Sequence, residues 1–171
     1  LFRDRNVDGI KTGHTDEAGY CLVASATRDD MRLIAVVMGT DSTDARAIES
    51  QKLLTYGFRF YQTLQLFGNN EVLSTERVWS GNINAVDIGI TEEVFATIPR
   101  GQEDNLETEL IIDETLKAPI TVGQVLGNVS IKLGEQVFYD GPVVAMEAVE
   151  RGSFIKRIMD FLHLFFLSLF G

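Results

Sequence analysis

The stretch from Thr63 to Gly152 repeats one pattern, in which short apolar runs alternate with polar residues and end at turns. Alternation with a period of two is typical of half-buried β-strands, whereas a helix repeats every three or four residues. Gly81-Asn82, Pro99-Arg100-Gly101 and Leu133-Gly134-Glu135 are typical turn sequences between such strands. The spacing predicts a small all-β sandwich or barrel of roughly 85 residues, which restricts every other element to the segments before and after it.

The segment before residue 63 has a different pattern. Residues 7–12 predict a short strand, and two apolar β-branched runs, Tyr20–Thr27 and Met31–Gly39, lie on either side of Arg28-Asp29-Asp30. Two such runs around a short polar break predict a β-hairpin. We therefore expect three strands at the start of the chain.

After Gly39 the apolar residues follow a helical period. Ser42 or Thr43 can cap the helix, which we expect to run to about Gln62. The residues expected near its apolar face are Ala45, Ile48, Leu53, Leu54, Phe58 and Tyr61. A strand, a hairpin and a long helix laid over them predict the end of an α/β sheet domain.

The composition excludes some classes of function. The net charge of −10 and the pI of about 4.6 repel nucleic-acid phosphates, so we expect no nucleic-acid partner. The single cysteine, Cys21, excludes an internal disulfide framework. The chain starts at Leu1 without an initiator methionine or a signal peptide, and we expect it to be part of a longer protein.

The predicted β domain also carries acidic residues in turn-like or solvent-facing positions: Glu92, Glu93, Glu103, Asp104, Asp113 and Glu114. Carboxylates can hold metal ions, but this domain contains no histidine that would support a metal site. We interpret these residues as a solvated acidic surface, and we expect neither a metal nor another cofactor.

Residues 153–171 change the pattern again. On a helical wheel one side collects the polar residues Ser153, Lys156, Arg157, Asp160, His163 and Ser168, and apolar residues cover most of the rest. A charged residue at the centre of a membrane-spanning helix costs about 2.5 to 3.5 kcal/mol. Three charges lie in this segment, so we do not expect it to cross a bilayer.

An amphipathic helix of this kind can instead lie in the membrane interface, with aromatic side chains among the acyl chains and basic side chains at anionic headgroups. The residues expected to anchor it in this way are Phe154, Lys156, Arg157, Phe161, Phe165, Phe166 and Phe170. The alternative is a C-terminal helix packed on the β domain. The number of phenylalanines exceeds what such packing usually needs, which favours binding to membrane lipid.

Lys11-Thr12-Gly13, followed by His14, adds reactive groups to the first predicted strand. The lysine supplies a fixed cation, the threonine a hydroxyl donor, and the glycine a position where a ligand can lie against the backbone. A strand with these groups can pair with an extended peptide and hold its carboxylate. By itself, the triplet is better explained as part of an exposed strand end and turn than as a ligand site.

The triplet resembles the third signature of the penicillin-binding proteins and serine β-lactamases, Lys-Thr-Gly. The runs "VDGIKTGHTDEAGYCLVASA", "MRLIAVVMG" and "ESQKLLTYGFRFY" are similar to the end of the catalytic domain of the D-alanyl-D-alanine carboxypeptidases, the low-molecular-mass penicillin-binding proteins five and six of Gram-negative bacteria. These enzymes also have a β-rich C-terminal domain and an amphipathic anchoring helix, which the remaining chain resembles in layout and in pieces such as "TIPRG" and "GPVVAMEAV".

The resemblance implies an α+β fold in three parts. Residues 1–62 would be the C-terminal end of a transpeptidase-like α/β domain, residues 63–152 a small all-β sandwich domain, and residues 153–171 an amphipathic membrane-anchoring helix. It also implies a peripheral position on the periplasmic face of the bacterial inner membrane, with inner-membrane lipid as a partner.

The resemblance further implies roles at a catalytic cleft for Lys11, Thr12 and Gly13. Lys11 would supply positive charge and a hydrogen-bond link to the catalytic network, and Thr12 would help bind the terminal carboxylate of the D-Ala-D-Ala stem peptide. His14 would shape the cleft rather than act as a general base. Arg46 takes the place of a family arginine near the carboxylate subsite, although a surface charge on the helix is an equal alternative.

The family's other two signatures, Ser-x-x-Lys with the nucleophile and Ser-x-Asn, precede Lys-Thr-Gly. This chain has formal matches only after the triplet, at Ser153-Phe-Ile-Lys156 in the last helix and Ser80-Gly-Asn82 in a predicted turn, and we reject both as catalytic. We therefore expect the chain to hold one wall of an active site without the nucleophile. On its own it should neither become acylated by penicillin nor release D-alanine.

The parent protein that the resemblance implies is a serine-type carboxypeptidase. It would remove the terminal D-alanine from peptidoglycan pentapeptides through an acyl-serine intermediate during cell-wall synthesis, and it would react with β-lactams. The alternative from another class is a non-enzymatic, membrane-attached β module that binds a partner or acts as a spacer, in which the triplet is a vestige.

Overall fold

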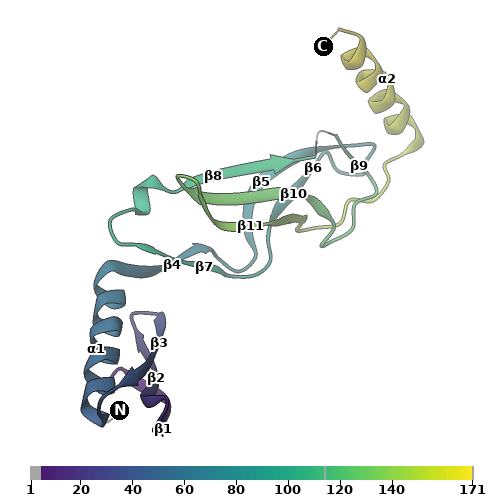
Figure 1. Cartoon of the computed structure of the whole chain (residues 1–171). Helices are drawn as coiled ribbons and strands as arrows, with labels where there is room; N and C mark the ends of the chain where they lie inside the picture. Colours follow the sequence, from purple (N-terminus) through teal and green to yellow (C-terminus); the bar gives the residue numbers. More distant parts are fainter. Residues whose placement is uncertain (1–4, 114, 171) are drawn as a thin grey trace. The chain divides into compact units, whose positions relative to one another are not determined.

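The computed structural model describes residues 5–113 and 115–170, with side chains described up to Phe166 in the last helix (Figure 1). They form two compact units, the first comprising residues up to 64 together with 97–103, and the second residues 65–96 together with those from 104 onward. In chain order the elements are β1 (Val7–Thr15), β2 (Gly19–Arg28), β3 (Met31–Thr40), α1 (Thr43–Phe60), β4 (Tyr61–Phe67), β5 (Glu71–Trp79), β6 (Ala85–Ile90), β7 (Val94–Pro99), the short 3-10 helix Glu103–Asn105, β8 (Glu107–Ile112), β9 (Leu116–Lys117), β10 (Val125–Leu133), β11 (Gln136–Ala145) and α2 (Phe154–Phe170).

The first unit begins with an antiparallel sheet in the order β1-β2-β3. The predicted hairpin is confirmed, and its turn residues Asp29 and Asp30 have φ angles of 48° and 62°. Two successive left-handed residues are what a two-residue turn needs to match the twist of its strands, and aspartate tolerates this conformation. Figure 1 shows α1 lying alongside these three strands.

The cap and the extent of α1 agree with the sequence prediction. The Ser42 side chain accepts a hydrogen bond from the Ala45 N–H at 3.1 Å, which is the usual role of a helix N-cap. The helix ends at Phe60, two positions before the expected end at Gln62, because Tyr61 has an extended backbone and begins β4.

The predicted apolar face of α1 is wrong in part. The helix packs on the sheet through Ser50, Leu54 and Phe58, which recur every four residues and are buried. By contrast Ile48 is 52% exposed and Leu53 is 51% exposed. A helix turns by about 100° per residue, so these two side chains lie well away from the stripe that meets the sheet.

The core of the first unit lies between α1 and one face of the sheet. It consists of Leu22, Ala24, Ala26, Met31, Ala35, Leu54 and Phe58. Residues that alternate with these along β3 have the opposite exposure: Ile34, Val36 and Met38 are 61%, 57% and 73% exposed. Among the described residues of this unit, the sheet is therefore covered on one face only.

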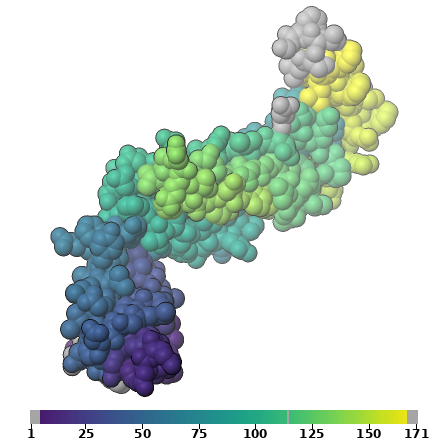
Figure 2. All heavy atoms as spheres, in the orientation of Figure 1, coloured from purple at the N-terminus to yellow at the C-terminus, as the bar shows by residue number. Residues whose placement is uncertain are grey.

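The second unit contains a six-stranded sheet in the order β8-β10-β11-β6-β5-β9, and β4 pairs with β7 in a separate two-stranded sheet. The β-rich character predicted for this region is confirmed. The atoms of β10 and β11, in green, lie on the face of this unit that Figure 2 shows. The core includes six side chains with no exposed surface: Val86, Ile88, Val129, Val143, Ala145 and Val149.

The acidic residues singled out in the sequence are exposed at Glu92, Glu93, Glu103, Asp104 and Asp113, while Glu114 lies outside the described residues. Within residues 5–113 and 115–170, no three His, Cys, Asp or Glu side chains are grouped so that they could hold a metal ion. The pKa of Glu103 is lowered by its own backbone N–H and then by the Gln62 side chain, which donates a hydrogen bond to the Glu103 carboxylate.

Candidate functional site

Strand β1 carries the Lys11-Thr12-Gly13 triplet on an open edge. Every residue from Ile10 to Thr15 is exposed. The strand pairs with β2 on one side, and within the described part of the chain no strand pairs with its other edge. The backbone N–H and C=O groups along that edge are available to an added extended peptide.

The pairing register places the triplet's side chains on two faces. Lys11 lies opposite Val23, which lies opposite Val36, and directly opposed residues share a face of a sheet. Lys11 is therefore on the uncovered face, away from α1. Thr12 lies opposite the buried Leu22 and is on the side of α1.

The Lys11 ammonium group donates a hydrogen bond to the backbone carbonyl of Thr12 at 2.8 Å. Lys11 takes part in none of the three salt bridges found among the described residues, which join Arg32 to Asp8, Lys52 to Glu49 and Lys132 to Glu109. Its positive charge is therefore not matched by a carboxylate of the described chain, and an anion can approach it from solvent.

Arg46 connects helix α1 to the end of the triplet. Its guanidinium Nη1 donates hydrogen bonds to the backbone carbonyls of Gly13 at 3.0 Å and Cys21 at 3.3 Å, and the group lies 5.6 Å from the centre of the Tyr20 ring. This arrangement fixes the ends of β1 and β2 relative to α1. The use of Arg46 at a carboxylate subsite remains a prediction.

His14 packs against Tyr20, with ring centres 4.0 Å apart and the rings inclined by 37°. The two residues are paired in the register across the turn at residues 16–18. The sequence analysis missed Tyr20, although a short hairpin turn after Thr15 would have placed it opposite His14. The cleft-shaping role of His14 stays a prediction.

A second polar cluster that the sequence analysis missed lies at the start of β1. The Arg32 guanidinium donates to both Asp8 carboxylate oxygens, at 3.0 and 2.8 Å, and also to the Ser25 hydroxyl. The Arg32 hydrogen bond, followed by that of Ser25, lowers the pKa of the Asp8 carboxyl below its ordinary value of 3.8. The cluster spans all three strands of the sheet and ties β1 to β3 across β2.

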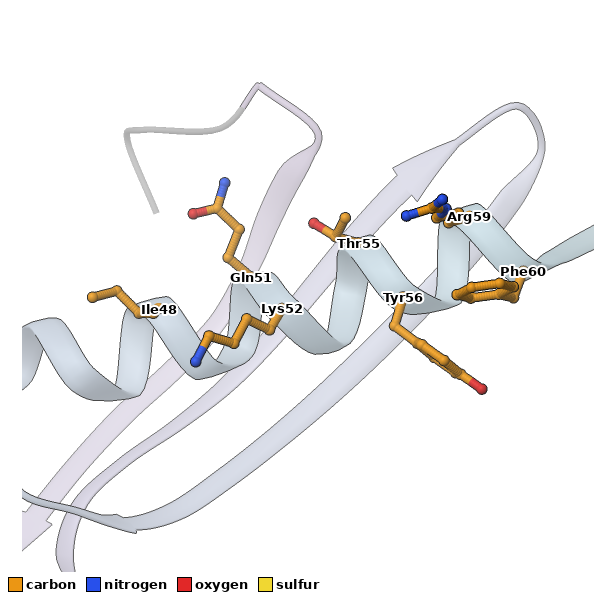
Figure 3. Close-up of a pocket in the computed structure, with 7 residues that line it drawn as sticks. All are labelled: Ile48, Gln51, Lys52, Thr55, Tyr56, Arg59 and Phe60. Carbon is orange, nitrogen blue, oxygen red and sulfur yellow. The ribbon is translucent and has the colours of Figure 1, made fainter.

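A shallow hollow of about 410 Å³ lies on the outward face of α1. Figure 3 shows the side chains that line it. Seven residues of the helix line it: Ile48, Gln51, Lys52, Thr55, Tyr56, Arg59 and Phe60. Residues 48, 52, 56 and 60 form one ridge of the helix and residues 51, 55 and 59 the next, so the hollow is the groove between two ridges. It is separate from the triplet and adds no group to it.

The two formal serine matches have structural roles in the second unit. Ser80 follows β5 in a tight bend with a φ of 61°. Ser153 directly precedes α2, and its hydroxyl accepts a hydrogen bond from the Lys156 N–H at 3.4 Å, as a helix cap does. The bend at Ser80 and the cap at Ser153 are structural features, and the Ser153 hydroxyl bonds a backbone N–H rather than a base that would activate a nucleophile.

The predicted C-terminal helix is present as α2, with its apolar side chains turned outward. The large exposed apolar residues described on it are Phe154, Ile155, Ile158, Met159, Phe161, Leu162, Phe165 and Phe166. The side chain of Phe170 lies outside the described residues. Within the described chain, none of the helices combines the length and the apolar character that crossing a membrane requires.

Comparison with known proteins gives two family matches. Residues 61–151 match the family described as "Penicillin-binding protein 5, C-terminal domain", and residues 1–42 match "D-alanyl-D-alanine carboxypeptidase". The first match alone covers more than half of the chain. The chain belongs to the penicillin-binding protein 5 family of D-alanyl-D-alanine carboxypeptidases.

Relatives in this family align with nearly the whole chain but are much longer. The chain is 41% identical over 167 residues to D-alanyl-D-alanine carboxypeptidase DacA of Escherichia coli K12 and covers 41% of its length. Against DacC of the same organism the identity is 45% over 167 residues, with 42% of that protein covered. The chain thus spans about two fifths of these relatives.

Solved structures agree with this assignment. Penicillin-binding protein 5 of Haemophilus influenzae superposes with a TM-score of 0.75 at 40% identity, over 85% of this chain and 43% of that one. The carboxypeptidase DacD of Francisella tularensis gives a TM-score of 0.64 at 36% identity, over 88% of this chain and 38% of that one. The expected family is therefore confirmed, and the chain corresponds to the C-terminal part of its members.

Proposed function

We propose that this chain supplies one wall of the active site of a serine-type D-alanyl-D-alanine carboxypeptidase. The observation that carries the proposal is the exposed Lys11-Thr12-Gly13 triplet on an unpaired strand edge of a chain from this family. The parent protein would remove the terminal D-alanine from peptidoglycan pentapeptides through an acyl-serine intermediate, and β-lactams would form the same ester.

In this proposal the triplet binds and orients the peptide terminus. The Lys11 ammonium provides positive charge beside the cleft, and the Thr12 hydroxyl donates a hydrogen bond to the substrate carboxylate. Gly13 lets the substrate backbone lie close to the strand. Arg46 holds the Gly13 carbonyl from α1 and keeps the end of the strand in place.

The serine nucleophile and its lysine would come from a part of the parent protein outside these residues. The exposed face of the sheet supports this arrangement, since Ile34, Val36 and Met38 lie on the same side as Lys11. An apolar patch next to a cationic site is what an interface with another part of a domain requires. The greater length of the relatives also leaves room for such a part.

Labelling with a fluorescent penicillin tests the proposal. The parent reading frame should yield a protein that becomes covalently labelled, whereas the 171-residue chain should not. Lys11→Ala in the parent should slow acylation by about 100-fold or more, since electrostatic groups at such sites contribute rate factors of this size. Lys52→Ala is the matched control, because Lys52 is an exposed lysine of α1 paired with Glu49.

Covalent labelling of the isolated chain would contradict the missing-nucleophile part of the proposal. A folded parent protein that neither takes the label nor releases D-alanine would instead favour the non-enzymatic β module. Equal acylation rates for Lys11→Ala and Lys52→Ala would remove the role proposed for the triplet.

We also propose that α2 holds the protein on a membrane surface, at the periplasmic face of the inner membrane. Its described phenylalanines are exposed, and Arg157 is exposed beside them, a pattern suited to acyl chains and anionic headgroups. Flotation with anionic liposomes should retain the full chain and lose a form that ends at residue 152. Phe161→Ser/Phe165→Ser should weaken flotation without truncation. Equal flotation of all three proteins would remove the membrane proposal.

A further inference from the structure

Helix α2 contacts the second unit through its polar side. The Asp160 carboxylate accepts a hydrogen bond from the backbone N–H of Ser80 at 2.7 Å. Three turns of the helix present half-buried residues on this side, namely Lys156, Asp160 and Leu164, which recur every four positions. The helix is therefore docked on the β domain by the side that an ordinary amphipathic helix would turn to water.

An aromatic contact adds to this docking. The His163 ring meets the Trp79 ring nearly edge-on, with centres 5.4 Å apart and an angle of 68°. Trp79 is only 9% exposed, and the Arg77 guanidinium lies 3.7 Å from its ring centre on the same unit. Rings at this distance and inclination attract each other beyond simple burial.

The segment that leads into α2 is bound to the same bend. The Gly152 N–H donates to the Ser80 carbonyl at 2.8 Å, and the Asn82 N–H donates to the Glu150 carbonyl at 2.8 Å. A Cβ on Gly152 would lie 2.5 Å from the Gly81 carbonyl oxygen, so only glycine permits this close approach. Because the helix is preceded by a hydrogen-bonded segment rather than a free linker, its direction from the β domain is defined.

Most of the apolar face of α2 is turned away from this contact, although Phe154, Ile158 and Phe161 line a hollow together with Ser80. At 100° per residue, Ile158, Leu162 and Phe166 lie roughly 160° to 240° around the helix from Asp160. All three are exposed, at 45%, 48% and 56%. The side of α2 that docks on the β domain is therefore largely opposite to the side with Leu162 and Phe166, which can enter a lipid surface while the helix stays docked.

We propose that α2 binds a lipid surface while it remains docked on the β domain, so that the bend at Trp79 and Ser80 is held beside the membrane in a fixed orientation. This inference rests on the membrane association proposed above. Lipid fits the apolar face better than a second copy of the chain, because two chains with a net charge of −10 repel each other whereas the exposed Arg157 at the border of this face can attract an anionic headgroup.

The protein contains a suitable reporter, since Trp79 is its only tryptophan. Acrylamide quenching of Trp79 fluorescence should be low for the full chain in buffer and should stay low on phosphatidylglycerol vesicles. Asp160→Ala should raise the quenching constant by about twofold or more, because loss of the Ser80 contact allows the helix to open locally. The same variant should still float with the vesicles, since its apolar face is unchanged.

Two further variants control this experiment. Asp160→Asn keeps a side-chain oxygen that can accept from the Ser80 N–H and should quench nearly like the wild type. Glu147→Ala removes an exposed carboxylate from the same unit and should change neither quenching nor flotation. Circular dichroism of each variant checks that the β domain remains folded, so that a rise in quenching reports on the helix.

The outcomes separate this inference from the membrane proposal. If the wild type floats but vesicles raise its Trp79 quenching to the level of Asp160→Ala, α2 undocks on binding and the inference is wrong. If the wild type does not float at all, the membrane proposal fails first. If sedimentation shows that the chain dimerises and Phe161→Ser/Phe165→Ser abolishes this, a second copy covers the apolar face and the inference is also wrong.

Discussion

The two units of this chain differ in how completely they bury their apolar side chains. The second unit closes around residues such as Ile88, Val129 and Val143, each with no exposed surface. The first unit covers one face of its sheet with α1 and leaves Ile34 and Met38 on the other face exposed to solvent. A closed core can stabilise a unit by itself, whereas a one-sided sheet keeps an apolar face for another partner.

Substitutions at matched isoleucines should give the largest contrast between the two units. Ile88→Ala removes a fully buried side chain and should lower the free energy of unfolding of the second unit by about 2–5 kcal/mol. Ile34→Ala removes an exposed side chain and should change that of the first unit by no more than about 0.5 kcal/mol. Urea denaturation followed by Trp79 fluorescence and by circular dichroism measures both, and a similar cost at the two positions would contradict the contrast.

Removal of the helix cap should have an intermediate effect confined to the first unit. Ser42→Ala deletes the oxygen that accepts the Ala45 N–H and should cost about 1 kcal/mol. The helical signal in circular dichroism should melt earlier, while the Trp79 transition of the second unit should not move. Ser42→Asp retains a cap and serves as the control; a shift of the Trp79 midpoint by Ser42→Ala would show that the units do not unfold separately.

The smallest effect should come from the Asp8–Arg32 pair, which is exposed to solvent. Because folding lowers the pKa of the Asp8 carboxyl below 3.8, the ionised pair stabilises the first unit above that pH. This contribution should fade as the pH falls through the folded pKa. Asp8→Asn should therefore reduce the acid-induced loss of stability, measured by urea midpoints from pH 6 down to pH 2, so that the series extends well below 3.8.

Asp16→Asn is the control for that measurement. It removes another exposed carboxylate near the first two strands, one that takes part in none of the salt bridges of the described chain. If both variants change the loss of stability at low pH by the same amount, the cause is the removal of a negative charge in general rather than the loss of the pair with Arg32.

The sequence predicted helices and strands more reliably than it predicted how they pack against each other. Alternation of apolar residues and the polar break at Asp29-Asp30 were sufficient for the hairpin, because these signals act within a few residues. The face of α1 was partly wrong, since hydrophobicity alone does not say which stripe meets the sheet, and Ser50 takes a buried position there. Local patterns fix what a segment forms, and tertiary packing decides which of its faces is covered.

At the candidate site, too, the local motif was predictable from the sequence and the tertiary contacts around it were not. The triplet could be read from three consecutive residues and a family resemblance, and its exposure agrees with the expected place at a cleft. The contact of Arg46 with Gly13 and the stacking of His14 on Tyr20 depend on the strand register and on the direction in which α1 returns. Neither property is encoded in a short motif.

The fold of this chain does not explain why position 13 is a glycine. A methyl group built there would meet nothing closer than the Cys21 Cβ at 4.0 Å, whereas at Gly89 and Gly127 it would lie 2.0 and 2.2 Å from carbonyl oxygens of neighbouring strands. Those two glycines are required by the fold itself. Alanine at position 13 would fit the folded chain, so a requirement for glycine there must come from whatever molecule docks along the strand from outside.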